Sequence, residues 1–234
     1  MSTFRIITLF PEFFTSPLES GLMGKAVKAG IVSVQMVNLR DYTDDPYRSC
    51  DDYPYGGGSG MVIKPEPLFR ALGEHAGKAT VVLTTPGGRL LDQGLVKTLS
   101  QKDDICILCG HYEGVDERVV EKYVDLEISI GDYILSGGEY AALVIMDAVV
   151  RYVPGFMSNP ESLKEESFES HLLEYPQYTR PADLEGYGVP EVLLSGDHAR
   201  IEKWRYLKSV EKTRRLRPDL YKRHLIRKIE GEEP

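Results

Sequence analysis

The chain has 234 residues, of which 42% are hydrophobic and 27% are charged, a composition that is ordinary for a soluble globular protein. No apolar run reaches membrane-spanning length, and the N-terminal MSTFRIITLF is too short and too weakly basic for a signal peptide, so we expect a cytoplasmic protein without a membrane partner. The formal net charge of −8, taken alone, argues against a nucleic-acid partner.

The first part of the chain alternates between strand and helix patterns. Residues 4–10 predict a strand, residues 18–27 carry a helical apolar stripe, and residues 31–39 return to strand character. This order predicts a parallel βαβ unit. Residues 41–60 then form a long segment rich in tyrosine and glycine, and its composition favours a function over disorder. Its glycines match neither a dinucleotide fingerprint nor a phosphate loop.

The alternation continues as far as residue 153. We expect helices over residues 66–76, 91–100 and 116–123 and strands over residues 80–85, 105–109 and 124–130. Residues 139–153 predict a helix that is apolar on nearly every side, and such a helix must be buried in the core or in a subunit interface. The whole pattern predicts an α/β fold in which a parallel sheet has helices on both faces.

Three turns with glycine lie between residues 110 and 139, each at the end of an apolar run. They contain Gly110, Gly131 and the pair Gly137-Gly138. Glycine lets the backbone turn sharply or approach a ligand with no side chain between them. A single turn of this kind is usually structural, but three clustered turns are as consistent with a ligand pocket as with punctuation of the fold.

The cysteines and histidines do not predict a metal site. Cys106 and Cys109 have C-x-x-C spacing, but on a strand their side chains point to opposite faces and cannot share a metal ion. We interpret them, with Cys50, as reduced core residues. The five histidines are scattered and form no H-E-x-x-H motif.

The last part of the chain differs in composition from the rest. Residues 158–169 are polar and acidic without periodicity, which indicates a linker, and two helices are predicted beyond residue 200. Residues 200–228 contain twelve Lys and Arg against three Asp and Glu, a net charge of +9 that leaves −17 for the rest of the chain. A basic segment on an acidic body is typical of contact with a phosphate backbone.

Several sequence segments resemble one known family. GHYEGVDER, SIGDYILSGGE and YGGGSGM are similar to signature segments of the bacterial tRNA (guanine-N1)-methyltransferases, the TrmD-type family of the knotted SPOUT methyltransferases. ITLFPEFF, TTPGGRLLDQG, EESFESHLLEYPQYTRP and VPEVLLSGDHARIEKWR follow in the order and spacing of that family. The resemblance therefore covers essentially the whole chain.

The resemblance implies a deep trefoil knot formed near residues 85–140 and a homodimer with the active site between subunits. With it, we expect a SPOUT domain over residues 1–157, a linker over 158–170 and a small all-α, tRNA-binding domain over 171–234. The implied reaction transfers a methyl group from S-adenosylmethionine to N1 of the guanosine immediately 3′ of the anticodon in tRNA. The partner is the anticodon stem-loop of tRNA, and DNA is not expected.

The resemblance also implies a set of cofactor-binding residues. They are Thr85, Pro86, Gly88, Gly110, Tyr112, Glu113, Ile130, Gly131, Asp132, Tyr133, Ile134, Leu135, Gly137 and Gly138. Among them, Glu113 is the carboxylate expected near the cationic sulfonium. Methylating N1 requires removal of its proton and stabilisation of charge toward O6, and neither step needs a metal ion. A Mg²⁺ requirement is compatible with the sequence but is not indicated by it.

Three charged residues match catalytic positions of the family. Arg151 matches its catalytic arginine, Glu166 the aspartate proposed as general base, and Glu174 a second aspartate. Without the resemblance, Arg151 would be assigned to the carbonyls at the end of its helix and the two glutamates to a solvated linker. The chain departs from the family in having Glu at both acidic positions, His111 in place of arginine, and Tyr140-Ala141 in place of Leu-Pro.

Two other functions remain open from the sequence. One is a SPOUT methyltransferase that acts at another RNA position, which the EESF…YTRP segment argues against because it belongs to this family. The other is a non-catalytic RNA-binding protein that uses only the basic C-terminal helices. Retention of the cofactor turns and of Arg151 argues against that second alternative.

Overall fold

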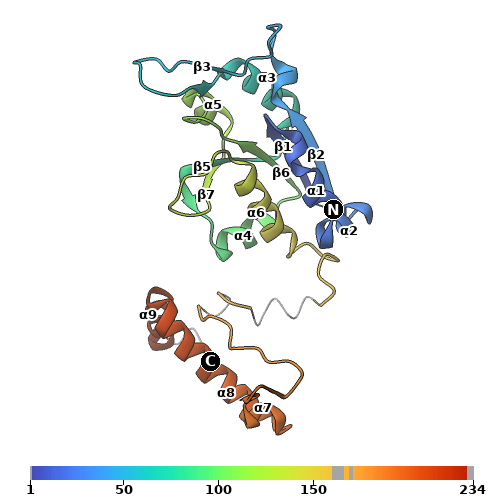
Figure 1. Cartoon of the computed structure of the whole chain (residues 1–234). Coiled ribbons are helices and arrows are strands. Elements are labelled where there is room, and N and C mark those ends of the chain that lie inside the picture. The colour runs from blue at the N-terminus through green and yellow to red at the C-terminus, as the bar shows by residue number, and fades with distance from the viewer. Residues whose placement is uncertain (1, 160–165, 169–170, 231–234) are drawn as a thin grey trace. The chain divides into compact units, whose positions relative to one another are not determined.

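The computed structural model describes residues 2–159, 166–168 and 171–230. The chain divides into two compact units, Met1–Ser158 and Asn159–Pro234, which Figure 1 shows in blue to yellow and in orange to red. Most of the linker expected over residues 158–170 lies outside the described residues. Among the helices of the described ranges, none has the length and hydropathy needed to cross a membrane.

The first unit is built on a five-stranded parallel sheet with the order β2-β1-β6-β5-β7. Its strands are β1 (Ser2–Thr8), β2 (Val32–Asn38), β5 (Thr80–Leu90), β6 (Asp104–Cys109) and β7 (Leu126–Ser129). The central strand β6 is DICILC and is buried from its second residue onward. A continuous apolar run is typical of a parallel strand that is covered on both faces.

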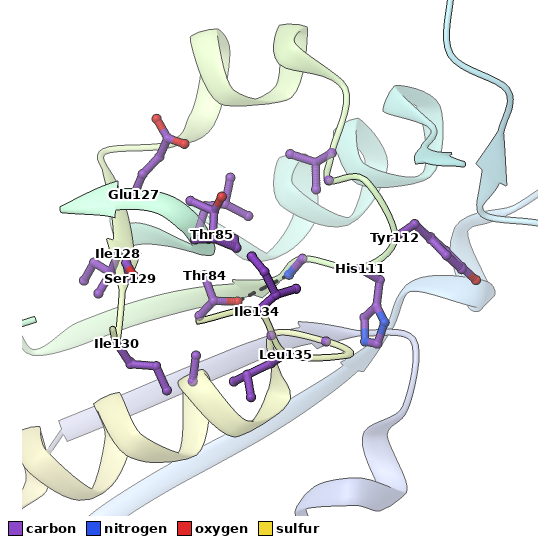
Figure 2. A pocket seen from close by; sticks show the side chains of 18 of the residues that line it. Thr84, Thr85, His111, Tyr112, Glu127, Ile128, Ser129, Ile130, Ile134 and Leu135 are labelled. Carbon is purple, nitrogen blue, oxygen red and sulfur yellow. Dashed lines mark hydrogen bonds between the residues drawn. The ribbon is translucent and has the colours of Figure 1, made fainter. Parts of the chain in front are cut away.

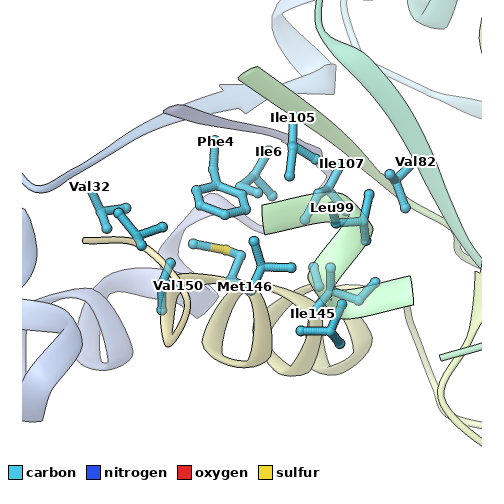
Figure 3. Close-up of a cluster of buried hydrophobic side chains, with 14 of the residues drawn as sticks. Phe4, Ile6, Val32, Val82, Leu99, Ile105, Ile107, Ile145, Met146 and Val150 are labelled. Atoms are coloured by element: carbon cyan, nitrogen blue, oxygen red, sulfur yellow. The ribbon is translucent and has the colours of Figure 1, made fainter. Parts of the chain in front are cut away.

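The two faces of the sheet have separate cores. Alternate residues of β6 divide between them, since Ile105 and Ile107 pack in one cluster while Cys106 and Leu108 pack in the other. The first core is covered by α2 (Gly21–Lys28), α4 (Gln93–Ser100) and α6 (Glu139–Val150). Figure 3 shows Phe4, Ile6 and Ile107 of the sheet against Ile145, Met146 and Val150 of α6. The second core is covered by α3 (Pro65–His75) and α5 (Glu117–Tyr123).

The remaining elements of the first unit are short. They are η1 (Pro11–Phe14), α1 (Thr15–Glu19), η2 (Leu39–Tyr42), and the two-stranded antiparallel pair β3 (Asp51–Asp52) and β4 (Val62–Ile63). This pair joins the two ends of residues 53–61, which include the second half of the tyrosine- and glycine-rich segment. A ladder of two residues on each strand carries no periodicity, so the sequence did not predict it.

The expected α/β architecture is confirmed, with helices on both faces of a parallel sheet. The expected end of one strand was wrong. β5 continues past residue 85 to Leu90, and its register on β7 shifts between Thr84 and Arg89, both of which pair with Ile128. Residues 85–88 therefore bulge out of the ladder. The bulge falls where the sequence predicted a turn at Pro86-Gly87-Gly88, but the strand continues through these residues and does not stop there.

Helix α6 is less enclosed than its composition suggested. Its inner face is fully buried, but Tyr140 is 54% exposed and Val144 45% exposed. Burial within the chain therefore does not account for the whole apolar surface of this helix.

The second unit contains α7 (Glu191–Leu194), α8 (His198–Leu216) and α9 (Pro218–Glu230). The expectation of an all-α domain was wrong in one detail, because β8 (Asp183–Leu184) and β9 (Tyr187–Gly188) form a hairpin. Its two-residue turn, Glu185-Gly186, has φ values of 53° and 84°. Positive φ at both turn residues matches the twist of paired strands, which explains a hairpin too short to give a strand pattern.

Candidate functional site

A cavity of about 360 Å³ lies beside the bulge of β5 and at the carboxyl ends of β6 and β7 in the first unit. In open parallel sheets, ligands bind outside the carboxyl ends of the strands. The walls come from the β5 bulge, the loop after β6, and the chain between β7 and α6, as Figure 2 shows.

The cavity brings together most of the residues that the sequence had singled out. Twelve of the fourteen expected cofactor residues line it, namely Thr85, Pro86, Gly110, Tyr112, Glu113, Ile130, Gly131, Tyr133, Ile134, Leu135, Gly137 and Gly138. Gly88 and Asp132 are not among the lining residues. The sequence reasoning missed other residues that line the cavity, including Thr84, Glu127 and Ser129. They lie on β5 and β7, and only the pairing of these two strands, which the sequence did not predict, could have identified them.

Gly138 is the point at which the pocket walls meet. A Cβ atom built on Gly138 would lie 2.7 Å from the amide nitrogen of Gly110 and closer still to the hydroxyl of Thr84. The amide of Gly138 donates to the carbonyl of Gly110 at 2.8 Å, and the amide of Gly110 donates to Thr84 Oγ1 at 3.3 Å. Only a residue without a side chain permits this close approach.

A buried carboxylate joins two of the walls. Glu139, the first residue of α6, is 3% exposed. Its carboxylate accepts hydrogen bonds from Thr8 Oγ1 at 2.6 Å and from His111 Nε2 at 2.7 Å. Burial raises the pKa of Glu139, but these hydrogen bonds outweigh it and the pKa lies below its ordinary value. The Glu139–His111 pair therefore links α6 to the loop after β6.

The tyrosine- and glycine-rich segment is tied to the same loop. The amide of Glu113 donates to the carbonyl of Met61 at 3.0 Å, and the amide of Ile63 donates to the carbonyl of Gly114 at 3.0 Å. Gly60 lies against the side chain of Glu113, where a Cβ atom would clash. The segment thus ends beside Glu113, whose carboxylate is expected near the cationic sulfonium.

The expected catalytic residues lie in different units. Arg151 directly follows α6, is half-buried, and is not among the residues that line the cavity. Glu166 and Glu174 belong to the second unit and are also partly buried. Their catalytic roles stay predictions. Glu165, adjacent to the expected base, lies outside the described residues.

The cysteines lie in the two cores. Cys106 and Cys109 pack in opposite clusters, which confirms that the C-x-x-C pair cannot share a metal ion. Burial raises the pKa of Cys106 to about 12 and that of Cys109 well above its ordinary value. Within the described residues, no three side chains of His, Cys, Asp or Glu gather as metal ligands do.

Comparison with known proteins gives a consistent result. A family model described as tRNA (Guanine-1)-methyltransferase TrmD matches residues 2–223. A Dictyoglomus turgidum protein named tRNA (guanine-N(1)-)-methyltransferase is 52% identical over 216 residues, which are 92% of this chain and 88% of that protein. Proteins of the same name from Trichodesmium erythraeum and Clostridioides difficile are 52% and 47% identical, each over 94% of this chain and 97% of its own length.

Two adjacent glycines in the β5 bulge provide a matched test of its geometry. A Cβ atom on Gly88 would lie 2.5 Å from the backbone of Glu127 and Ile128, whereas one on Gly87 would meet nothing within 4 Å. We expect Gly88→Ala to lower the free energy of unfolding by about 1–3 kcal/mol because β5 and β7 must move apart. Gly87→Ala should leave it unchanged or raise it by up to about 1 kcal/mol. Urea unfolding measures both, and equal effects of the two variants would contradict the observed bulge.

The buried carboxylate makes a prediction about pH. Because the pKa of Glu139 is lower in the folded state, its contribution to stability is present above its unfolded pKa and is lost as the pH falls through the folded value. We expect Glu139→Gln to destabilise the protein by about 1–3 kcal/mol at pH 7, and this difference should shrink as the pH falls below about 4.5. Urea unfolding of both proteins between pH 3.5 and 7 measures it. The exposed Glu121→Gln serves as the control, and a difference that does not depend on pH would refute the assignment.

Proposed function

Because the chain belongs to the TrmD family of tRNA (guanine-1)-methyltransferases, we propose that it transfers a methyl group from S-adenosylmethionine to N1 of a guanosine in tRNA. The proposed nucleotide is the one immediately 3′ of the anticodon. The observation that carries the proposal is the match over residues 2–223 together with the glycine-walled cavity beside the β5 bulge and the carboxyl ends of β6 and β7.

The cavity suits the proposed cofactor. Its volume of about 360 Å³ lies within the range of small-molecule sites, roughly 300–1,000 Å³. Ile130, Tyr133 and Leu135 offer backbone groups and an apolar wall for an adenine ring. S-adenosylmethionine supplies an activated methyl group on a sulfonium cation, and the carboxylate of Glu113 on the opposite loop supplies the complementary charge.

The chemistry of the guanine is assigned to three residues of this chain. Glu166 accepts the proton from N1 as general base, so that the lone pair of N1 is free to bond to the methyl carbon. Arg151 stabilises the negative charge that develops at O6. Glu174 lies in the same loop region as Glu166 and is the second carboxylate of the site. Glutamate is one methylene longer than the family's aspartate, which changes how far the base reaches.

We further propose that the enzyme is a homodimer with each site completed by the partner. In support, Tyr140 and Val144 of α6 are 54% and 45% exposed, and the cavity residues Tyr133 and Ile134 are 55% and 79% exposed. Exposed apolar and aromatic side chains of this kind are typical of a subunit interface. The family resemblance adds a trefoil knot formed near residues 85–140.

The second unit is the proposed site of tRNA binding. Its helices α8 and α9 span His198–Leu216 and Pro218–Glu230, and the +9 charge of residues 200–228 lies on these helices and on Arg217 between them. Lys and Arg side chains on the surface of two helices suit the phosphates of an anticodon stem-loop. Because the proposed substrate is tRNA, we also place the activity in the cytoplasm. Among the described residues, no contact favours either a different RNA position or a role without catalysis.

Mapping of methylated nucleosides tests the function directly. We expect the purified protein, incubated with labelled S-adenosylmethionine and unmodified tRNA, to produce 1-methylguanosine only at the position immediately 3′ of the anticodon. Mass spectrometry of nuclease fragments locates the product. Methylation at another site would favour the alternative SPOUT activity, and binding of RNA without binding of S-adenosylmethionine would favour the non-catalytic alternative.

The same methylation assay tests whether Glu166 is the general base. Glu166→Gln should lower the single-turnover rate by about 10²–10⁴-fold while the dissociation constants of cofactor and tRNA change little. Glu166→Asp should be milder, and Glu165→Gln should remain active. If Glu165→Gln were inactive and Glu166→Gln active, the base would have to be reassigned.

Subunit sharing is tested by mixing two inactive variants. An Arg151→Ala protomer combined with a Glu166→Gln protomer should recover one intact site in each mixed dimer, because each site takes one of these residues from each chain. Methylation by dimers isolated with two different affinity tags measures the recovery. Purified mixed dimers without activity would show that the two residues act in the same chain.

A further inference from the structure

Helix α8 makes specific contacts with the segment of the second unit that contains Glu174. The amide of Leu173 donates to Thr213 Oγ1 at 2.8 Å, and Lys212 Nζ donates to the carbonyl of Glu174 at 2.9 Å. Thr213 and Lys212 are adjacent in α8, so consecutive residues of the helix hold consecutive residues of the segment. Figure 1 labels α8 within the second unit.

Thr213 is buried, and its hydroxyl connects α8 to the segment that contains Glu174. It is 0% exposed, and its hydroxyl accepts from Leu173 while donating to the carbonyl of Ser209 at 2.7 Å. Threonine is a poor helix former and is costly to bury unless its hydroxyl is hydrogen-bonded. Its position inside a helix of 19 residues is explained by the bond to Leu173.

The segment that α8 holds is in turn bonded to the residue after Glu166. The amide of Glu174 donates to Ser167 Oγ at 2.9 Å. Phe168 adds a second bond across the same loop, since its amide donates to the carbonyl of Leu172 at 3.0 Å. The contacts form one path from Lys212 and Thr213, through Leu173 and Glu174, to Ser167 and thus to the backbone of Glu166.

Packing on both sides of this path restrains it further. Leu172 is buried, and the guanidinium of Arg205 lies 4.7 Å from the centre of the Tyr175 ring. The rings of Tyr178 and Trp204 are 6.3 Å apart. Trp204, Arg205, Lys212 and Thr213 of α8 thus contact residues between 173 and 178. These contacts are more than the binding of RNA phosphates requires.

We propose that Thr213 and Lys212 are positioning residues for the methylation reaction, because they fix the loop that presents Glu166 to the guanine N1 proton. The inference rests on the proposed function and assigns α8 a second task besides binding tRNA. The proton still passes from N1 to the carboxylate of Glu166, and α8 acts only through the backbone of the loop. A base held within a fraction of an ångström of its working position is what proximity catalysis requires.

The test compares Thr213→Val, which keeps the shape and removes the hydroxyl, with Thr213→Ser, which restores it. We expect Thr213→Val to lower the single-turnover rate at saturating tRNA and S-adenosylmethionine at least tenfold, with both dissociation constants within twofold of the wild type. Thr213→Ser should recover most of the rate. Thr98→Val, at an exposed helical threonine that bonds the carbonyl four residues earlier, is the matched control.

Lys212→Met provides a second variant in case the first does not fold. It should show the same loss of rate at saturating tRNA. Lys208→Met, one turn earlier on α8 and paired with Glu211, shows how much of the effect comes from loss of charge alone. Hydrogen exchange of the peptide over residues 171–178 should show faster exchange of the Leu173 and Glu174 amides in both test variants.

The outcomes separate the inference from the function on which it rests. A wild-type protein that does not methylate guanosine would remove the proposed function and this inference with it. A wild type that methylates, together with variants whose amides exchange faster but whose rates are normal, would overturn the positioning role alone. A loss that disappears at saturating tRNA would also overturn it, since it would assign Thr213 and Lys212 to RNA affinity.

Discussion

The approach of Gly138 to Thr84 and to the backbone of Gly110 sets the geometry of the cavity, because it brings the ends of β5 and β6 and the start of α6 into direct contact. No side chain separates these elements, so their backbone groups are available along the wall. The same contact places Glu139 beside His111, where its carboxylate is buried and satisfied by Thr8 and His111. A buried charge is tolerated only with such partners, and its removal from water is offset by bonds that also hold the wall in place.

The sequence predicted the parts of the fold that depend on repeated patterns. The apolar run of β6 predicts burial on its own, and the glycine turns after β6 and β7 became a predicted cofactor pocket when the family resemblance was added. Features set by single contacts were missed. The return of β5 to β7 after Gly88 depends on a backbone contact across the sheet, and the β8–β9 hairpin depends on two positive φ angles. Neither leaves a periodic signal.

The catalytic assignment shows a different limit of sequence reasoning. Glu166 and Glu174 are proposed as catalytic residues only through the family resemblance, since a carboxylate in a polar segment has no distinguishing pattern. Thr213 and Lys212 lie about forty residues further along the chain and bond to the backbone amide of Leu173 and the backbone carbonyl of Glu174. Every residue has such a carbonyl and nearly every residue has such an amide, so the sequence does not mark the contact. Charge alone suggests RNA binding for α8, but the hydrogen bonds of Thr213 and Lys212 connect this helix to the segment that contains Glu174.

The position of β6 between β1 and β5 has a consequence for synthesis on the ribosome. β1 and β2 pair early, but the other edge of β1 waits for residues 104–108. At roughly 5–20 residues per second, that edge stays open for several seconds of translation. During this time its N–H and C=O groups are available to any other extended chain nearby. The short β1–β2 pair, covered by little more than α1 and α2, is therefore the stage at which the nascent polypeptide is most exposed to misassembly, and the arrival of the central strand ends it.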